Sequence, residues 1–215
     1  MSCFDDLAEK WDADPAKRER ALAWAREIRK QVPLTRNMTA MEYGCGTGLL
    51  SLHLHADLGH IIAADRSQGM LDVLDARIRT HGIPNMETQR LDLTEDPLPM
   101  MKLDLIYTAM TLHHIADIDR ILEAFSSLLK EGGWLGIIDL DTEDGSFHGF
   151  SFDGHRGFDR KILAGRLRQA ELLDIRSCTV CTITKMVGGG REQHFPLFFM
   201  RGRKAETGLA GNRGD

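Results

Sequence analysis

The sequence predicts an α/β fold: a seven-stranded mixed sheet with an antiparallel last strand, helices on both faces and an N-terminal helical cap. Three observations predict it. Strand-like and helical patterns alternate from Met38 onward, which is typical of right-handed βαβ units. A glycine-rich turn at residues 44–48 follows the first apolar run and leads into a helical pattern. The all-glycine triplet 188–190 joins the last two strand-like runs and is short enough for a hairpin.

The region before the sheet, residues 1–35, is predicted to form the cap, with two helical pieces between residues 5 and 31. Asp14 and Pro15 are typical of an N-cap followed by proline in the first turn. Apolar residues then recur at helical spacing, namely Ala21, Leu22, Ala25 and Ile28. Such a segment would either pack on the domain or cover a cleft.

Residues 36–204 are predicted to form the main domain, and the polar, glycine-rich residues 205–215 a disordered tail. The strand-like runs are residues 38–43, 60–64, 87–93, 103–108, 134–140, 178–186 and 194–203. The helical segments are 70–78, ended by Gly82; 118–129, ended by Gly132 and Gly133; and a helix capped by Asp159 that runs through Ala170.

Composition excludes several classes of protein. The 215 residues, 42 % hydrophobic and 27 % charged, suit one globular domain. The 27 basic and 32 acidic residues give a net charge of −5, which disfavours a dedicated nucleic-acid binder. No apolar run approaches the ~20 residues of a membrane helix, and the N-terminus does not resemble a signal peptide. Four cysteines form no disulfide frame, so we expect a cytoplasmic protein, either a monomer or a homodimer.

The glycine turn discriminates between ligands. A dinucleotide fingerprint needs a small residue at its sixth position, where this chain has Leu49. Glu42 lies two residues before Gly44, and its carboxylate would repel a pyrophosphate and attract a cationic ligand. A nucleotide-like ligand with a cationic end therefore fits the turn better than a dinucleotide does.

Residues 42–48 resemble the first motif of class I S-adenosylmethionine-dependent methyltransferases, acidic-x-Gly-x-Gly-x-Gly. The resemblance covers roughly residues 38–140. It includes Asp65 after the second strand, residues 91–93, the segment 112–117 that is common in the ubiquinone/menaquinone-type small-molecule branch, and residues 128–135. It implies a Rossmann-like fold, S-adenosylmethionine as cofactor, S-adenosylhomocysteine as product, and direct methyl transfer to a small-molecule acceptor.

The resemblance also implies roles for individual residues in binding the cofactor. Glu42 would serve the methionyl ammonium and order the loop, and Asp65 would accept both ribose hydroxyls. Asp92 would take the adenine amino group, with the Leu93 amide touching the ring. The remaining cofactor contacts implied are Trp11, Gly44, Gly46, Gly48, Arg66, Met70, Thr108 and Ala109. In related small-molecule enzymes a helical aromatic near the start of the chain often closes over the cofactor, so Trp11 would either do this or simply pack on the domain.

Histidines are the candidate bases for an acceptor that is protonated at neutral pH, namely His113, His114, His148 and His155. His113 follows the fourth strand, at the sheet edge where open α/β sheets bind ligands, and is the candidate catalytic residue. The alternatives are that His113 only shapes the pocket or is structural. The histidines and phenylalanines of residues 147–158 would line an acceptor pocket or pack on the sheet.

Two side-chain pairs admit other chemistry. Asp139 and Asp141 alternate along the fifth strand and with Asp153 could hold Mg²⁺, although the preferred interpretation has no metal. Cys178 and Cys181 have redox-like spacing, but residues three apart in a strand face opposite sides, so we interpret both as core residues.

Two rival functions stay open at this point: a Rossmann-type NAD-dependent oxidoreductase and a non-catalytic protein that binds S-adenosylmethionine. Residues 107–110, Tyr-Thr-Ala-Met, lack the Asp/Asn-Pro-Pro-aromatic motif of methyltransferases that act on base amines in nucleic acid. The segments that would set the acceptor, residues 1–35 and 142–160, carry the least information.

Overall fold

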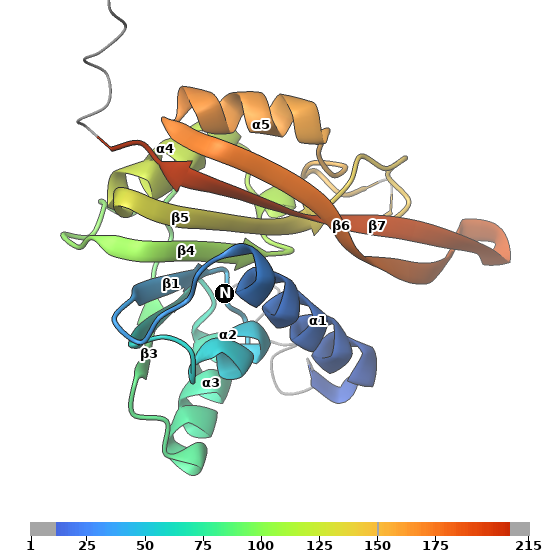
Figure 1. Ribbon diagram of the computed structural model, residues 1–215. Coiled ribbons are helices and arrows are strands. Elements are labelled where there is room, and N and C mark those ends of the chain that lie inside the picture. Colours follow the sequence, from blue (N-terminus) through green and yellow to red (C-terminus); the bar gives the residue numbers. More distant parts are fainter. Residues whose placement is uncertain (1–11, 150, 207–215) are drawn as a thin grey trace, which may run out of the picture.

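The computed structural model describes residues 12–149 and 151–206. It contains one seven-stranded sheet in the order β3-β2-β1-β4-β5-β7-β6 (Figure 1). The strands are β1 Thr39–Tyr43, β2 His60–Asp65, β3 Met86–Arg90, β4 Leu103–Ala109, β5 Leu129–Leu140, β6 Leu172–Val187 and β7 Arg191–Lys204. The helices are α1 Pro15–Gln31, α2 Leu49–Leu54, α3 Gln68–His81, η2 Leu112–His114, α4 Ile118–Leu128, α5 Arg160–Gln169 and η3 Gly188–Gly190.

The sheet confirms the predicted mixed topology. Strands β1 to β5 pair in parallel, whereas β7 is antiparallel to both β5 and β6. A dinucleotide-binding Rossmann sheet has the order 3-2-1-4-5-6, so the insertion of β7 beside β5 sets this fold apart. The tight connection through η3 makes the β6–β7 hairpin that the glycine triplet predicts.

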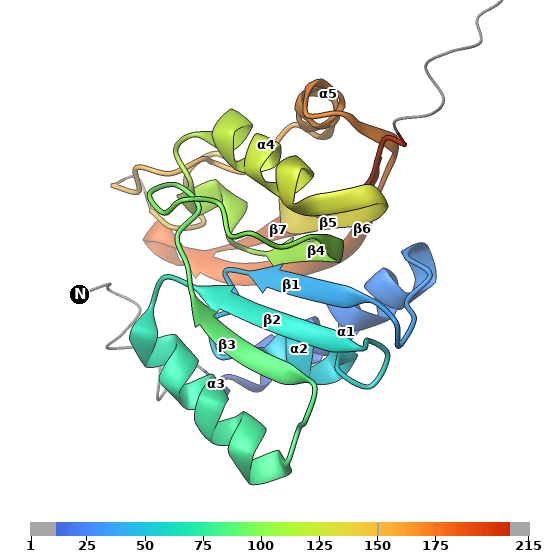
Figure 2. The same ribbon diagram turned by 90° about the vertical axis from the view of Figure 1, so that its left-hand side faces the viewer.

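Helices cover both faces of the sheet, as Figure 2 shows: α4 and α5 lie on one face, and α1, α2 and α3 on the other. Each face has its own apolar core. The first packs Phe125 of α4 and Leu167 of α5 against the sheet. The second packs Ile28 of α1, Leu54 of α2 and Leu74 of α3. All five side chains are essentially inaccessible to water. Burial of such apolar surface is the dominant favourable contribution to folding.

Local end signals place the helices correctly in most cases. The Asp14 carboxylate accepts the Ala16 amide, so α1 begins at Pro15 as predicted. It forms one continuous helix, and the earlier predicted piece lies mostly outside the described residues. The Ser67 hydroxyl caps α3, which ends at Gly82 in the left-handed conformation. The predicted tail also lies largely outside the described residues.

Two local predictions were wrong, and both fail at irregularities in strands. Gly132 and Gly133 do not end α4; they lie inside β5, beside a register shift in its pairing with β4, where Gly132 has φ 71°. Cys178 and Cys181 do not face opposite sides: the Cys178 Sγ contacts Glu27, and the Cys181 Sγ accepts the Trp24 ring N–H, both from α1. The register shift after Thr179 inverts the alternation along β6.

No helix within the described ranges 12–149 and 151–206 is long and apolar enough to cross a membrane.

Candidate active site at the carboxyl ends of the strands

The glycine turn after β1 adopts the backbone that its sequence demands. Gly44, Gly46 and Gly48 all lie in the left-handed region, with φ of 73°, 53° and 74°. Two of them also leave no room for a side chain. A Cβ at Gly44 would lie 2.3 Å from Thr111 Cγ2, and one at Gly48 would lie 2.4 Å from Leu74 Cδ1. The turn is therefore shaped by the packing of the protein itself as well as by any ligand.

Glu42 is buried beneath this turn, at 3 % exposure. Its Oε2 accepts the Ser51 amide at 3.0 Å and also the Ser51 hydroxyl, so it ties β1 to the helix that follows the turn. Burial raises the pKa of Glu42 from 4.5 to about 8, with the nearby Asp65 adding to the rise. Glu42 is thus protonated at neutral pH unless a cation approaches it. Its role in ordering the loop agrees with these bonds, and its contact with an ammonium stays a prediction.

Asp65 links the turn to the next helix. Its Oδ2 accepts the Gly46 amide at 2.7 Å and its Oδ1 accepts the Ser67 amide at 2.8 Å. Burial raises the pKa of Asp65, against these two hydrogen bonds and the Arg66 charge, which lower it. The carboxylate therefore sits between the glycine turn and the start of α3, where a ribose is expected.

The two residues predicted to contact the adenine, Asp92 and Leu93, lie in a turn after β3. The Asp92 Oδ1 accepts the Thr94 amide at 3.0 Å and the Thr94 hydroxyl at 2.6 Å. The Leu93 amide donates to the Tyr43 hydroxyl at 3.1 Å, so the donor that the resemblance assigns to an adenine ring already has a protein partner. The contact of the Asp92 carboxylate with an adenine amino group stays a prediction.

The remaining predicted cofactor residues differ in exposure. Met70 and Thr108 are buried, Ala109 is half-buried and Arg66 is exposed. The Thr108 hydroxyl, at the end of β4, is buried without a hydrogen-bond partner in the described part of the chain. A buried polar atom without a partner is unfavourable, and a hydrogen bond from a ligand at this edge of the sheet would remove that cost. Trp11 lies outside the described residues.

Asp12 is a residue of this site that the sequence reasoning missed. It is 6 % exposed, accepts the Thr47 hydroxyl at 2.8 Å and forms an ion pair with Arg77 of α3. Arg77 in turn donates to the Thr47 carbonyl at 3.2 Å. The segment before α1 therefore lies against the glycine turn. No sequence signal marks Asp12, because an aspartate in a polar segment is ordinary.

His113 occupies the edge of the sheet beside the turn. It lies on η2, and its Nδ1 is 2.6 Å from Asp139 Oδ1, with both side chains buried. Because a carboxylate only accepts hydrogen bonds, we assign the Nδ1 proton to the imidazole, which leaves the lone pair on Nε2. Thr111, two residues earlier, packs on Gly44 and joins the histidine to the glycine turn.

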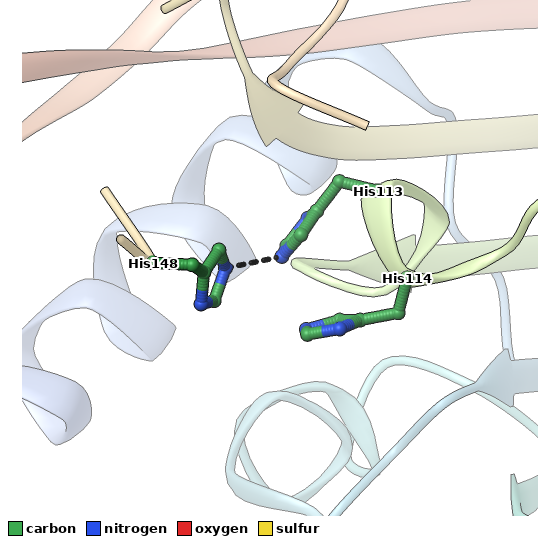
Figure 3. A group of neighbouring side chains, drawn as sticks. All are labelled: His113, His114 and His148. Atoms are coloured by element: carbon green, nitrogen blue, oxygen red, sulfur yellow. Dashed lines mark hydrogen bonds between the residues drawn. The ribbon is translucent and has the colours of Figure 1, made fainter. Parts of the chain in front are cut away.

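Two further histidines surround His113, as Figure 3 shows. The His148 Nε2 lies 3.0 Å from the His113 Nε2, and the His114 and His113 ring centroids are 4.2 Å apart. Phe152 stacks on His148 at 4.3 Å. Partial burial, together with the neighbouring His113, lowers the pKa of His114 and of His148 to about 4, so both are neutral at physiological pH. The His155 ring lies instead against Phe158 and the Ala116 carbonyl.

The contacts of Asp139 and Asp141 do not favour the magnesium alternative. Asp139 is committed to His113, whereas Asp141 forms a two-point ion pair with Arg160, with Nε to Oδ1 at 2.6 Å. Two carboxylates that each already bind a different cationic or N–H partner do not converge on one ion. The alternation along β5 was a sound guide to the strand but not to the partners that each carboxylate would find.

Comparison with known proteins agrees with this geometry. Residues 40–133 match the methyltransferase domain family. The chain is 33 % identical over 119 residues to an uncharacterized methyltransferase of Schizosaccharomyces pombe, covering 52 % of this chain and 42 % of the relative. It is 28 % identical over 123 residues to the ubiquinone/menaquinone biosynthesis C-methyltransferase of Shewanella frigidimarina, covering 55 % and 49 %. The chain thus spans about half the length of these relatives.

The crystal structure of an S-adenosylmethionine-dependent methyltransferase from Aquifex aeolicus shares the fold, with a TM-score of 0.67 at 21 % identity over 93 % of this chain and 97 % of that one. Residues 40–133 thus match a methyltransferase domain, and the fold of the chain is the one seen in the methyltransferase from Aquifex aeolicus. Residues 40–133, from β1 to the start of β5, are the part of the chain that matches the family.

Proposed function

We propose that the chain transfers a methyl group from S-adenosylmethionine to a small-molecule acceptor with an acidic hydroxyl, such as a phenol or hydroquinone. The observation that carries this proposal is the buried His113–Asp139 pair beside the glycine turn. The relative from Shewanella frigidimarina is named for ubiquinone and menaquinone biosynthesis, which supports an acceptor of hydroquinone type. The partly aromatic surroundings of His113, with Phe152 and His148, suit a planar ring.

The residues present fit the cofactor. The three left-handed glycines offer a backbone that a ligand can approach, and Asp65 and Asp92 have further acceptor capacity beyond their present bonds. The buried Thr108 hydroxyl lacks a partner within the described residues. When bound, S-adenosylmethionine supplies a methyl group on a positively charged sulfur, which is already a strong electrophile. The protein therefore mainly aligns the reactants and excludes water.

Proton removal is the step that this chain's own side chains would perform. A phenolic hydroxyl has a pKa of about 10 and keeps its proton at neutral pH. The lone pair of His113 Nε2 faces His148 Nε2, which lies 3.0 Å away in a hydrogen bond that the acceptor hydroxyl would replace. His113 would then accept the proton of that hydroxyl, and Asp139 would stabilise the imidazolium that forms. The ionised oxygen, or the ring carbon that it activates, would then take the methyl group as the S–CH₃ bond breaks and leaves the thioether of S-adenosylhomocysteine. If a ring carbon is methylated, the proton on that carbon is lost as the ring regains aromaticity.

A direct test measures ligand binding first and methyl transfer second. In calorimetry, S-adenosylhomocysteine should bind with a dissociation constant on the order of micromolar, whereas NAD should not bind. Binding of NAD alone would favour an oxidoreductase and overturn the proposal.

For transfer, S-adenosylmethionine labelled in its methyl group is incubated with a hydroquinone, a phenol, an aliphatic alcohol, a thiol and an amine. We expect label on the hydroquinone or the phenol. Label only on the amine or the thiol would refute the acceptor class. Cofactor binding with no transfer to any of the five would favour the non-catalytic alternative.

A further inference from the structure

The three histidines beside the glycine turn have the spacing of metal ligands. One nitrogen from each of His113, His114 and His148 can be chosen so that all three lie within 4.8 Å of one another. Across residues 12–149 and 151–206, no other group of three or more histidine, cysteine or acidic side chains meets this criterion. Figure 3 shows the rings of His113 and His148 with their nitrogens turned toward each other and His114 beside them.

We propose that His113, His114 and His148 bind one divalent transition-metal ion of the zinc class. Imidazole nitrogens suit zinc, copper and nickel, whereas magnesium and calcium prefer oxygen ligands. Three protein ligands leave a fourth position open in a tetrahedral site. Zinc–nitrogen bonds of about 2.0–2.1 Å place tetrahedral ligands about 3.3 Å apart. The 3.0 Å between the Nε2 atoms of His113 and His148 is already close to that separation.

Asp139 supplies the outer carboxylate that such sites use. Metal-binding histidines usually donate their second ring N–H to a carboxylate or carbonyl, which fixes the ring and the tautomer. Here the Asp139 carboxylate lies 2.6 Å from His113 Nδ1, so Nε2 presents its lone pair to the other two rings. This ligand is pre-oriented, because both His113 and Asp139 are buried.

The other two rings have room to complete the site. His114 and His148 are exposed, so small rotations can bring their nitrogens onto an ion. Phe152 stacks on the face of His148 and leaves the nitrogens in its ring plane accessible. Arg66 and Lys185 lie near His114 and His148 and oppose a cation, whereas Asp139 attracts it. These opposing charges predict moderate affinity and not the very tight binding of a structural zinc site.

Metal binding has a consequence that rests on the proposed function. The ion uses the same His113 lone pair that the acceptor's proton would need, so a bound ion should inhibit methyl transfer. Binding itself does not depend on His113 being a base, and it can be measured without cofactor or acceptor.

The experiment titrates zinc into the metal-free full-length chain in competition with a chromophoric chelator, and repeats the titration with cobalt for its visible absorption. We expect one ion per chain, with a dissociation constant on the order of micromolar. His114→Ala and His148→Ala should each weaken binding about tenfold or more, and Asp139→Asn should weaken it about 10- to 100-fold. His194→Ala, a control on the exposed His194 of β7, should bind zinc as the unmodified chain does.

The proposal is overturned if zinc binding is not saturable, or if the three site variants bind like the His194→Ala control. Circular dichroism and S-adenosylhomocysteine binding check that each variant is folded. Zinc that binds at the histidines but leaves methyl transfer unaffected would count against His113 as the base and not against the metal site. Reversible inhibition that a chelator relieves would support both.

Discussion

The proposed cofactor side of the site, around the glycine turn, and the proposed acceptor side, around His113, are built in different ways. On the cofactor side, local bonds from side chain to backbone, such as Glu42 to Ser51 nine residues on and Asp65 to Ser67 two residues on, combine with longer ones, such as Asp65 to Gly46 across 19 residues. On the acceptor side, the contacts join distant segments. His113 meets Asp139 across 26 residues and His148 across 35.

The difference shows how the two functions can be separated. The glycine turn is held by close packing against Thr111 and Leu74, whereas His114 and His148 are exposed rings. Fixed backbone on one side suits a cofactor that is always the same. The exposed side chains of His114 and His148 can adjust to an acceptor or to an ion. Mutations should therefore affect cofactor binding or turnover, and seldom both.

The largest expected effect is on turnover. His113→Gln removes the lone pair that would accept the acceptor's proton, and methyl transfer to a hydroquinone should fall about 10²- to 10⁴-fold. Affinity for S-adenosylhomocysteine should stay within about threefold, since His113 contacts Asp139 and not the glycine turn. Initial rates with labelled cofactor measure the loss of turnover, and calorimetry measures the affinity for S-adenosylhomocysteine.

The matched control for this prediction is His155→Gln, because the His155 ring lies against Phe158 and the Ala116 carbonyl. It should leave the rate unchanged. Asp139→Asn should slow transfer in the same direction as His113→Gln, since it removes the carboxylate that fixes the ring. Normal turnover in His113→Gln would assign His113 a structural role.

The second effect is on stability and depends on pH. Glu42 has an ordinary pKa of 4.5 when unfolded and about 8 when buried in the fold. Between these values the folded chain holds a proton that the unfolded chain has lost, so stability falls as pH rises. The loss is up to about 1.4 kcal/mol per pH unit. Glu42→Gln cannot ionise, so its advantage over the unmodified chain should grow from about pH 5 to pH 8 and then level off.

Urea unfolding at several pH values, with the exposed Glu131→Gln as control, measures this difference. A constant gap between Glu42→Gln and the unmodified chain across the range would mean that Glu42 is already ionised when folded. The glycine turn would then rest on a buried charge, which needs a cation near Glu42 to balance it.

Local signals predicted most of the fold. The Asp14, Ser67 and Gly82 end signals act through neighbouring backbone, so they can be read directly from the sequence. Gly132 shows the limit of this reasoning. A left-handed glycine ends a helix in one context and sits in an irregular strand in another, and only the pairing of β4 with β5 decides between them.

The candidate site follows the same rule: residues set by local spacing could be located from the sequence, and contacts between distant segments could not. The glycine turn, Glu42 and Asp65 stand at family spacing, so their positions followed from the chain alone. Alternation along β5 placed Asp139 correctly on its strand but could not show that His113 would occupy its carboxylate. Asp12 meets Thr47 across 35 residues and has no local signal. Contacts between distant segments depend on tertiary packing, which no spacing rule encodes.

The third effect tests whether the glycine turn is held by packing as well as by backbone conformation. Gly48→Ala puts a Cβ 2.4 Å from Leu74 Cδ1 at φ 74°, and should lower the free energy of unfolding by about 3 kcal/mol. Gly82→Ala is the control, since φ is 60° there but nothing lies within 4 Å of the new Cβ. It should lose only about 1–2 kcal/mol. Equal losses in denaturant unfolding would mean that the contact with Leu74 adds nothing.

The smallest effect concerns the segment that lies against the turn. Asp12→Ala removes the acceptor of the Thr47 hydroxyl and the partner of Arg77, so S-adenosylhomocysteine affinity should fall about three- to tenfold. Asp14→Ala is the matched control: it weakens the start of α1 by about 1 kcal/mol and should leave affinity unchanged. If calorimetry gives the two variants the same affinity, the segment only packs on the domain. If Asp12→Ala alone binds more weakly, the contact between Asp12 and Thr47, across 35 residues, helps to hold the cofactor.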